Sequence, residues 1–380
     1  MLFAVPALSD LDQQVIREVE DKRQALRHSV AEPRRWGGML RRTLLAAAVQ
    51  GSNSIEGYVI DDQDAVAAVE VQEPISADER IWPEIVGYRQ ALTYVLQLGQ
   101  DADFRYEASV LRSLHFMLLS HELASWPGRF RQGAVYVHDE RSDRVVYECV
   151  GWEQAPALVD EVMAELAREE ASSLVRGAMA HLNLVMIHPF RDGNGRMARV
   201  LQTLVLARDH VVSPEFSSIE EYLGHNTAGY YRVLAEVGSG AWHPEHDALP
   251  WVRFCLRAHH IQAQTVEARV RETSLVLAAL DQLVSRLSLP PRAVDGALYD
   301  ASLGHRVRRS DYVARVGVEE RTATRDLQAL VEAGLLEAHG ERRGRTYAAT
   351  RRVRGIRNDA RRDRPPVDDP YAVSEQPTLR

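Results

Sequence analysis

The sequence is poor in several residue types and segments whose absence limits what the protein does. Among its 380 residues there are two cysteines, Cys149 and Cys255. That number is too small for a disulfide framework or a cysteine-ligated zinc site, so a reduced, cytoplasmic setting fits. No apolar run reaches the length of about 18 residues that a transmembrane helix needs, so no membrane partner is expected. The first residues also lack a basic segment followed by an apolar core, which argues against a secretory signal.

What is present points to a chain of two or three folded units with an uneven charge. Hydrophobic residues make up 45% of the sequence, enough for a sizeable core, and the length exceeds that of a typical single domain. Residues 301–364 carry 16 arginines against 9 acidic residues, a net of +7, although the whole chain has a net charge of −8. An acidic body followed by a basic module indicates nucleic-acid contact in the C-terminal part.

One stretch of twelve residues concentrates polar side chains between two apolar segments. Residues 174–187 and 197–207 flank it and are apolar at helical spacing. Pro189 should end the first helix, because proline disfavours the α conformation of the residue before it. The stretch reads His188-Pro189-Phe190-Arg191-Asp192-Gly193-Asn194-Gly195-Arg196-Met197-Ala198-Arg199.

The second half of this stretch has the features of an anion site. Gly193 and Gly195 permit positive φ angles, so that successive N–H groups can point into one concavity. That concavity opens onto the N-terminus of the following helix, which attracts anions. Arg196 and Arg199 lie three residues apart on one side of this helix and add donors suited to phosphate.

The first half supplies a base and a carboxylate. Asp192 next to a phosphate site is a natural ligand for Mg²⁺, and His188 has the side chain best suited to accept a proton near neutral pH. Each feature alone has a simpler interpretation: a histidine before proline often only ends a helix, a Gly-x-Gly turn is often only a turn, and helical arginines are often solvated. Their combination in this order and spacing favours a functional site.

The stretch resembles the signature of the Fic family, His-Pro-Phe-x-Asp-Gly-Asn-Gly-Arg-x-x-Arg, at every fixed position. The resemblance implies a mostly α-helical fold and transfer of AMP from ATP to a hydroxyl group of a protein side chain. It implies that His188 deprotonates this hydroxyl and that Asp192 holds Mg²⁺. The phosphate contacts that it implies come from Gly193, Asn194, Gly195, Arg196 and Arg199.

A second stretch, Ser52-Asn53-Ser54-Ile55-Glu56-Gly57, has two interpretations. It can be an ordinary helix end with a C-terminal glycine. Some Fic proteins, however, carry Ser/Thr-x-x-x-Glu-Gly/Asn on an inhibitory helix, and Ser52, Glu56 and Gly57 match that pattern. The resemblance implies that Glu56 pairs with Arg199 in the place of the γ-phosphate, since carboxylate and phosphate both accept the forked guanidinium.

Two further features are interpreted through the same resemblance. Alternating residues on both sides of a turn at 139–144 predict a β-hairpin, which is either a surface hairpin without function or the flap that docks the target chain by strand addition. Tyr230 and Tyr231 are either both core residues or, by the resemblance, lie near the adenine; Gly238 stands where some relatives have asparagine. The edge predicted to dock the target comprises Val135, Tyr136, Val137 and His138.

The C-terminal part resembles a winged helix-turn-helix. A helix at 309–316, a glycine turn, a helix at 321–333 and a basic hairpin around 340–344 follow in that order. Such modules contact DNA from the first turn of their second helix, but some dock proteins instead. The candidate DNA contacts are Arg321, Thr322, Thr324 and Arg325.

The predicted fold is therefore mainly α. It comprises an N-terminal helical region with the inhibitory helix (1–75), a Fic-type catalytic bundle with a small β-hairpin flap (76–270), a winged helix-turn-helix domain (271–350) and a disordered tail (351–380). Within it, a long helix from residue 251 to 270 should lead into a linker, and a new helix should start near residue 275.

Two functions compete on this basis. One is a protein adenylyltransferase that uses ATP and Mg²⁺ to modify Ser, Thr or Tyr hydroxyls, including its own, under restraint by Glu56. The other is a DNA-binding transcriptional regulator whose Fic-like body senses a nucleotide. The intact motif favours the enzyme, because a sensor has no need of His188 as a base. Expected partners are ATP and a hydroxyl-bearing protein, with DNA at the C-terminal domain and a homodimer as further arrangements that the sequence allows.

Overall fold

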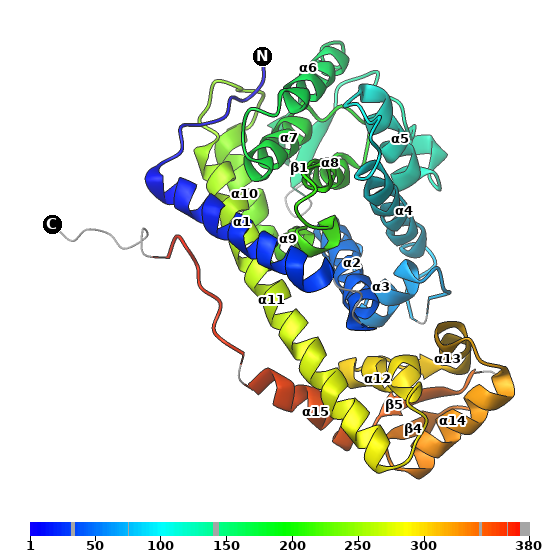
Figure 1. Ribbon diagram of the computed structural model, residues 1–380. Helices are drawn as coiled ribbons and strands as arrows, with labels where there is room; N and C mark the ends of the chain where they lie inside the picture. The colour runs from blue at the N-terminus through cyan, green and yellow to red at the C-terminus, as the bar shows by residue number, and fades with distance from the viewer. Residues whose placement is uncertain (32–34, 75, 140–143, 342–343, 363, 373–380) are drawn as a thin grey trace. The chain divides into compact units, whose positions relative to one another are not determined.

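The computed structural model describes residues 1–31, 35–74, 76–139, 144–341, 344–362 and 364–372. They form two compact units (Figure 1). Unit 1 consists of Met1–Pro33, Arg41–Gln264 and Asp368–Arg380, and unit 2 of Arg34–Leu40 and Thr265–Val367. Within the described residues, none of the helices combines the length and apolar character that crossing a membrane requires.

The predicted mainly α fold is confirmed. The helices up to residue 238 are α1 (Asp10–Ala31), α2 (Arg35–Ile55), α3 (Asp62–Val69), α4 (Trp82–Leu98), α5 (Ala108–Leu119), α6 (Ala155–Arg168), α7 (Ser173–Ile187), α8 (Asn194–Arg208), α9 (Glu220–His225) and α10 (Thr227–Gly238). Two short 3-10 turns, η1 (Leu123–Ser125) and η2 (Pro214–Phe216), and two strands, β1 (Tyr136–Asp139) and β2 (Arg144–Glu148), complete this part.

The core of unit 1 is built around α8. This helix packs against α7, α4 and α5, which surround it in Figure 1. Nearly all of its residues are buried, including Arg196 and Arg199, whose charges pair with carboxylates of Glu84 and Glu56. The helix pair α7–α8 therefore fixes the ends of the connecting motif turn within a rigid core.

The N-terminal region predicted for residues 1–75 is helical, and its first helix packs into unit 1. Val15, Ile16 and Val19 of α1 share a buried cluster with residues of α7 and α10. Arg23 of α1 pairs with Asp209 after α8 at 2.5 Å. An amphipathic helix cannot bury its apolar face alone, so α1 folds as part of unit 1.

The hairpin forms where it was predicted, and β1 pairs antiparallel with β2. Tyr147 of β2 anchors it to the core, since its hydroxyl donates to the Met186 carbonyl at 3.1 Å. The other edge of β2 bonds to the loop after α10, where the Glu148 N–H donates to the Gly240 carbonyl at 2.8 Å. The predicted turn falls mostly on residues 140–143, which lie outside the described residues.

The prediction of a linker near residue 271 was wrong. One continuous helix, α11 (Leu249–Arg286), runs through this region, and the boundary between the units falls inside it, at Gln264 and Thr265. No glycine or proline occurs between Trp251 and Leu289, so nothing local breaks the helix.

Unit 2 continues with a three-stranded antiparallel sheet of order β3-β5-β4 and helices packed on it. Its order of elements is the one predicted for a winged helix-turn-helix, with Gly317 in the left-handed conformation after α13. Part of the predicted basic hairpin loop, residues 342–343, lies outside the described residues. The elements are η3 (Val294–Leu298), α12 (Tyr299–Leu303), β3 (Val307–Arg308), α13 (Arg309–Val316), α14 (Glu320–Glu332), β4 (Leu336–His339), β5 (Thr346–Ala349) and α15 (Arg351–Arg362).

The prediction of a disordered tail from residue 351 was wrong for its first part. Residues Arg351–Arg362 form α15, because Val353 is buried and Arg357 and Arg361, one turn apart, both pair with Glu272 of α11. Farther along, Tyr371 is buried in unit 1, where its hydroxyl donates to Asp12 at 3.0 Å. The arginine-rich composition concealed these specific carboxylate partners. Residues 373–380 lie outside the described residues.

Candidate functional site

The proposed base, His188, sits at the end of α7 in a left-handed conformation with φ of 52°. Its Nδ1 lies 3.0 Å from the Val185 carbonyl oxygen. Because a carbonyl only accepts, Nδ1 carries the proton and Nε2 keeps its lone pair. Burial lowers the pKa of His188, so the neutral, basic form persists below the usual histidine range.

Arg131 binds the backbone carbonyls at the start of the motif turn, a role that the sequence did not predict. Its Nε donates to the His188 carbonyl and its Nη1 to the Gly133 carbonyl, both at 2.8 Å. Its backbone N–H donates to the Pro189 carbonyl at 3.0 Å. The guanidinium also donates to Val150, just after the hairpin, so one buried side chain joins the hairpin base to the motif turn.

His115 of α5 holds the other end and was also missed. Its ring stacks on Phe190 with centroids 3.8 Å apart and planes 6° from parallel. The Gly128 N–H donates to Nδ1 at 2.8 Å, which leaves Nε2–H to donate to the Asp192 carbonyl at 3.0 Å. Burial lowers the pKa of His115 to about 4, so the ring stays neutral. The signal in the sequence was weak, since a single histidine on an apolar helix is commonly a core residue.

The start of α8 has no side-chain cap for its first backbone N–H groups. Gly193 precedes it with φ of 72°, as the glycine turn predicted. The Asn194 side chain bonds to the backbone before the helix: its oxygen accepts from the Phe190 N–H at 2.9 Å and its nitrogen donates to the Phe190 carbonyl at 3.0 Å. Asn194 thus closes the turn, and any phosphate contact from it would come from its main-chain N–H.

Asp192 is exposed beside this helix start. One carboxylate oxygen accepts the Gly193 N–H at 2.6 Å, and within the described part of the chain the other oxygen has no hydrogen-bond donor. A single free carboxylate oxygen next to phosphate-binding N–H groups fits Mg²⁺, which takes one or two carboxylates together with phosphate oxygens.

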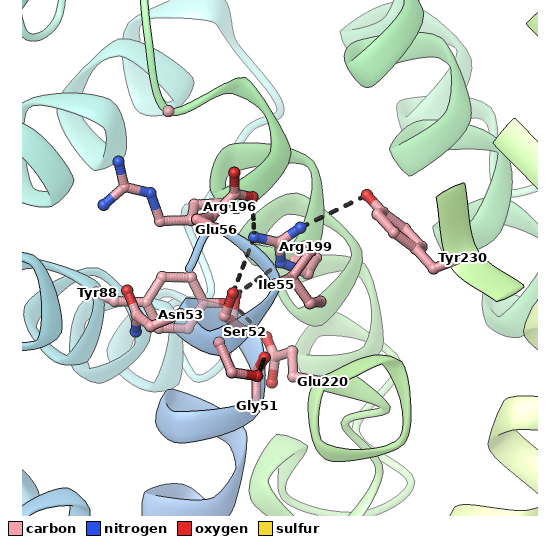
Figure 2. Close-up of polar contacts among 12 residues, drawn as sticks. Gly51, Ser52, Asn53, Ile55, Glu56, Tyr88, Arg196, Arg199, Glu220 and Tyr230 are labelled. Carbon is pink, nitrogen blue, oxygen red and sulfur yellow. Dashed lines mark hydrogen bonds and ion pairs between the residues drawn. The ribbon is translucent and has the colours of Figure 1, made fainter. Parts of the chain in front are cut away.

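Arg199 is the centre of a buried polar cluster (Figure 2). Its side chain is fully buried, and its Nη2 contacts a carboxylate oxygen of Glu56 at 2.5 Å. Its Nε donates to the Ser52 hydroxyl at 2.7 Å and Nη2 to the Ser52 carbonyl at 3.1 Å. Although burial alone would lower it, the Glu56 charge raises the pKa of Arg199, so the guanidinium stays charged.

Glu56 lies over the start of α8 as well as against Arg199. A Cβ added to Gly195 would stand 2.6 Å from the Glu56 Oε1, so only glycine allows this approach. The carboxylate therefore occupies the helix N-terminus, where the dipole and the free N–H groups favour a negative charge. Gly57, with φ of 82°, also ends the α2 segment in the left-handed conformation, as the helix-end interpretation predicted, and an inhibitory role of Glu56 stays a prediction.

Arg196 faces the opposite direction from Arg199, as Figure 2 shows. Its guanidinium pairs with Glu84 of α4 and lies 5.2 Å from the centroid of the Tyr58 ring. Although burial by itself would raise it, Arg196 and the neighbouring His121 hold the pKa of Glu84 below its usual range. A phosphate role for Arg196 remains a prediction that requires this pair to open.

The two tyrosines divide between the alternatives. Tyr230 is a core residue: it is buried, and its hydroxyl lies 3.0 Å from His181 Nε2 and 3.5 Å from Arg199 Nη1. Tyr231 is 47% exposed, and its hydroxyl donates to the Ile55 carbonyl at 3.2 Å. Only Tyr231 keeps an accessible ring face for a base. Close packing explains the glycine at position 238, because an added Cβ would lie 3.1 Å from the side chains of Met186 and Tyr147.

The remaining predicted residues lie on exposed surface. In the hairpin, Tyr136 and His138 are exposed, and Val135 and Val137 are partly buried. Among the described residues no strand pairs with the outer edge of β1. On α14, Arg321, Thr324 and Arg325 are exposed and Thr322 is partly buried.

The comparisons with known proteins agree with this site. The Fic/DOC family model matches residues 105–206, which span α5 to α8 and include the whole motif turn. The chain is 26% identical over 277 residues to "Protein adenylyltransferase Fic" of Nematostella vectensis, covering 72% of this chain and 59% of that protein. It is 31% identical over 266 residues to "Protein adenylyltransferase fic-1" of Caenorhabditis elegans, covering 68% and 47%. The chain thus spans about half the length of the curated relatives it matches.

Solved structures show the same fold. A Fic family protein from Desulfovibrio desulfuricans superposes with a TM-score of 0.57 at 21% identity, over 91% of this chain and 98% of that one. Fic-1 from C. elegans superposes with a TM-score of 0.51 at 23% identity, over 68% and 71%. Together, the comparisons support a Fic family protein whose relatives are named adenylyltransferases.

Proposed function

We propose that this Fic-type chain transfers AMP from ATP to a Ser, Thr or Tyr hydroxyl of a protein. The observation that carries the proposal is the motif turn itself. At one end of its five residues stands a neutral histidine with a free Nε2, and at the other a helix N-terminus without a side-chain cap. A base and an anion site at the two ends of one turn suit an attack on a phosphate by a hydroxyl.

In this reaction the target oxygen attacks the α-phosphorus of ATP, and the bond from that phosphorus to the β-phosphate oxygen breaks. His188 Nε2 takes the proton of the hydroxyl, and pyrophosphate leaves. The N–H groups at the start of α8 bind the phosphates. Asp192 would hold Mg²⁺, which neutralises charge on the phosphate oxygens when it is bound.

We propose that Glu56 restrains this activity. Its carboxylate holds Arg199 and covers Gly195, the two groups to which the terminal phosphate of ATP would otherwise bind. Because one guanidinium fork serves either anion, ATP and Glu56 compete for it. The bound nucleotide is then held in a pose unsuited to transfer until Glu56 moves away.

The hairpin is the proposed docking edge for the target. Val135 to His138 follow Arg131 and Gly133, whose contacts tie the hairpin base to the carbonyl of His188. An extended target segment adding to the outer edge of β1 would gain main-chain hydrogen bonds that do not depend on its sequence.

Incubation with ATP labelled at the α- or the γ-phosphate tests the reaction. The α-label should become covalently attached to protein and the γ-label should not. Attachment of the γ-label alone would mean phosphate transfer and would overturn the proposal. Asp192→Ala should lower the Mg²⁺ dependence of labelling, and unchanged dependence would remove Asp192 from the metal site.

A second candidate function for unit 2 is DNA binding. The net charge of +7 over residues 301–364 and the exposed arginines at the start of α14 favour it. In this view the module directs the enzyme to a location or partner, and protein docking is the alternative outcome of a DNA-binding assay.

A further inference from the structure

The C-terminal half of α2 passes α9 at a distance that only glycine permits. A Cβ added to Gly51 would lie 2.5 Å from the Glu220 carbonyl oxygen and 2.7 Å from the Glu221 Cα. A Cβ added to Gly224 would lie 2.6 Å from both the Cα and the carbonyl oxygen of Gly51. The two helices therefore touch backbone to backbone at these glycines, which we name the Gly51–Gly224 contact.

The α9 side of this contact is fixed to the core. Glu220, the first residue of α9, is buried, and its carboxylate accepts hydrogen bonds from Tyr88 of α4 at 2.8 Å and Thr203 of α8 at 3.0 Å. The Ser218 hydroxyl donates to the same carboxylate. Three donors on separate segments hold this buried carboxyl group, so α9 offers a rigid support for α2.

The α2 side of the contact leads directly to the Arg199 cluster, as Figure 2 shows. Gly51 is followed by Ser52, whose hydroxyl and carbonyl both accept from Arg199. Glu56 follows five residues after Gly51, and its N–H donates to the Asn53 carbonyl at 3.0 Å, which closes the last turn. A shift of the backbone at Gly51 therefore moves Ser52 and Glu56 together.

The size of the required shift is large compared with the tolerance of a hydrogen bond. Carbon atoms need about 3.5 to 4 Å between them, so an alanine at either glycine forces the helices apart by about 1 Å. The 2.5 Å bond between Glu56 and Arg199 would then lengthen to a distance at which little of a hydrogen bond remains.

We infer that the Gly51–Gly224 contact positions Ser52 and Glu56 on Arg199, and that the restraint of the enzyme depends on this close approach of α2 to α9. The inference rests on the proposed restraint by Glu56. It assigns a positioning role to two glycines and to the buried Glu220, none of which touches the nucleotide site itself.

The test measures self-labelling by α-labelled ATP in Gly224→Ala and Gly51→Ala, alone and combined with Glu56→Gly. Each alanine variant should label faster than wild type, by about tenfold for the loss of one charge-assisted bond. In the Glu56→Gly background the same alanines should add nothing, because the restraint has already been removed. A purely structural role would instead change the rate equally in both backgrounds, and that result would overturn the inference.

Gly99→Ala is the matched control. Its added Cβ would stand 3.0 Å from the Ala207 Cβ and 3.3 Å from the Ala207 carbonyl oxygen, at the C-terminal ends of α4 and α8, so it strains the core at a place that includes neither Gly51 nor a donor to Glu220. It should lower the melting temperature without raising the labelling rate. Ser218→Ala removes one donor to Glu220 and inserts no atom. It should raise the labelling rate by less than the glycine variants do, and it tests the inference if those variants do not fold.

Amide exchange gives a readout that does not depend on transfer. In the alanine variants the amides of Glu56 and Tyr58, which both donate to Asn53, should exchange at least about tenfold faster than in wild type. Unchanged exchange in folded variants overturns the inference whatever the activity. Faster exchange without any activation by Glu56→Gly supports the positioning role and counts against the proposed restraint instead.

Discussion

Arg199 of unit 1 and Arg325 of unit 2 differ in whether their charges are buried against a carboxylate or exposed to solvent. In unit 1, Arg199 is fully buried, and its three nitrogens contact Ser52, Glu56 and Tyr230. In unit 2, Arg325 at the start of α14 is 75% exposed, and its nearest carboxylate lies 3.9 Å away. A buried charge left without a counter-ion is strongly destabilising, whereas an exposed one is solvated by water. In the proposed functions, the first arginine therefore exchanges one anion for another, and the second attracts anions from solution.

The largest expected effect comes from removing the base while leaving both of these arginines intact. We expect His188→Ala to reduce transfer by about 10² to 10⁴, the usual contribution of a positioned base. ATP binding should be retained, because the proposed phosphate contacts come from α8. Initial labelling rates and equilibrium ATP binding measured on the same preparation test this. The exposed His225, substituted by alanine, is the matched control and should label like wild type. Full activity in the His188 variant would rule out the mechanism.

Removing the carboxylate that pairs with Arg199 should have the next largest effect on the rate of transfer. In Glu56→Gly the guanidinium loses its internal carboxylate and becomes free for the nucleotide. Since a hydrogen bond to a charged group contributes about 1.5 to 3 kcal/mol, the rate of transfer should rise by roughly ten- to a hundredfold.

Initial rate and melting temperature must be measured together on this variant. If Glu56 were only a residue at a helix end, the substitution would lower the melting temperature and leave the rate unchanged. A folded variant no more active than wild type would end the inhibitory interpretation.

The contrast between the units extends to histidine and predicts different acid sensitivity. Burial lowers the pKa of His115 to about 4 and of His181 and His259 to about 3, all in unit 1. Of the two histidines of unit 2, His339 is exposed and His305 is partly buried, so both are less enclosed than these three. Below a pH of about 6.5 the unfolded chain binds protons that folded unit 1 does not, so the stability of unit 1 is complete above that pH and falls as the pH decreases.

At pH 5 this linkage amounts to about 2 kcal/mol for His115 alone. Protection factors for amide exchange, compared between pH 7 and pH 5, separate the two units. Amides of α5, α7 and α11 within unit 1 should lose protection, while those of α13 and α14 should change less. An equal loss in both units would contradict the assignment to buried histidines.

The smallest expected effect concerns the exposed arginines. If unit 2 binds DNA, the logarithm of its binding constant should fall linearly with the logarithm of the salt concentration. Replacing Arg321 and Arg325 by alanine should make this slope shallower by about one unit for each DNA phosphate that is no longer neutralised. Glu337→Gln, an exposed change in the same unit, is the control and should not reduce the slope. Absence of binding to any duplex at low salt would assign the module to protein docking.

The sequence predicted the motif turn and the contact of Glu56 with Arg199 because both depend on a short signature read through a family resemblance. It did not predict the partners of side chains within that signature. Arg196 meets Glu84 from a helix 112 residues earlier, and Asn194 bonds to the backbone of Phe190. Such contacts depend on which helices pack together, and neither local spacing nor residue type specifies that.

Helix ends marked by proline or glycine were predictable, and those set by distant partners were not. Pro189 and Gly193 bound the motif turn as expected. A break inside α11 was expected at Ser274, but no residue there disfavours helix. The helix α15 was missed because its stabilising ion pairs involve Glu272, on a different helix.

The return of the chain to unit 1 near its C-terminus sets the order in which the protein can be completed during synthesis. The buried carboxylate of Asp12 bonds to Ser9 nearby and to Arg253, but also to Tyr371. The main part of unit 2, Thr265–Val367, lies between Arg253 and Tyr371 in the chain, so these residues must be made before this last bond can form. At about 5 to 20 residues per second, the ribosome needs on the order of ten seconds to add them. During that interval all residues of the motif turn have already been made, while the side of α1 that receives Tyr371 stays uncovered.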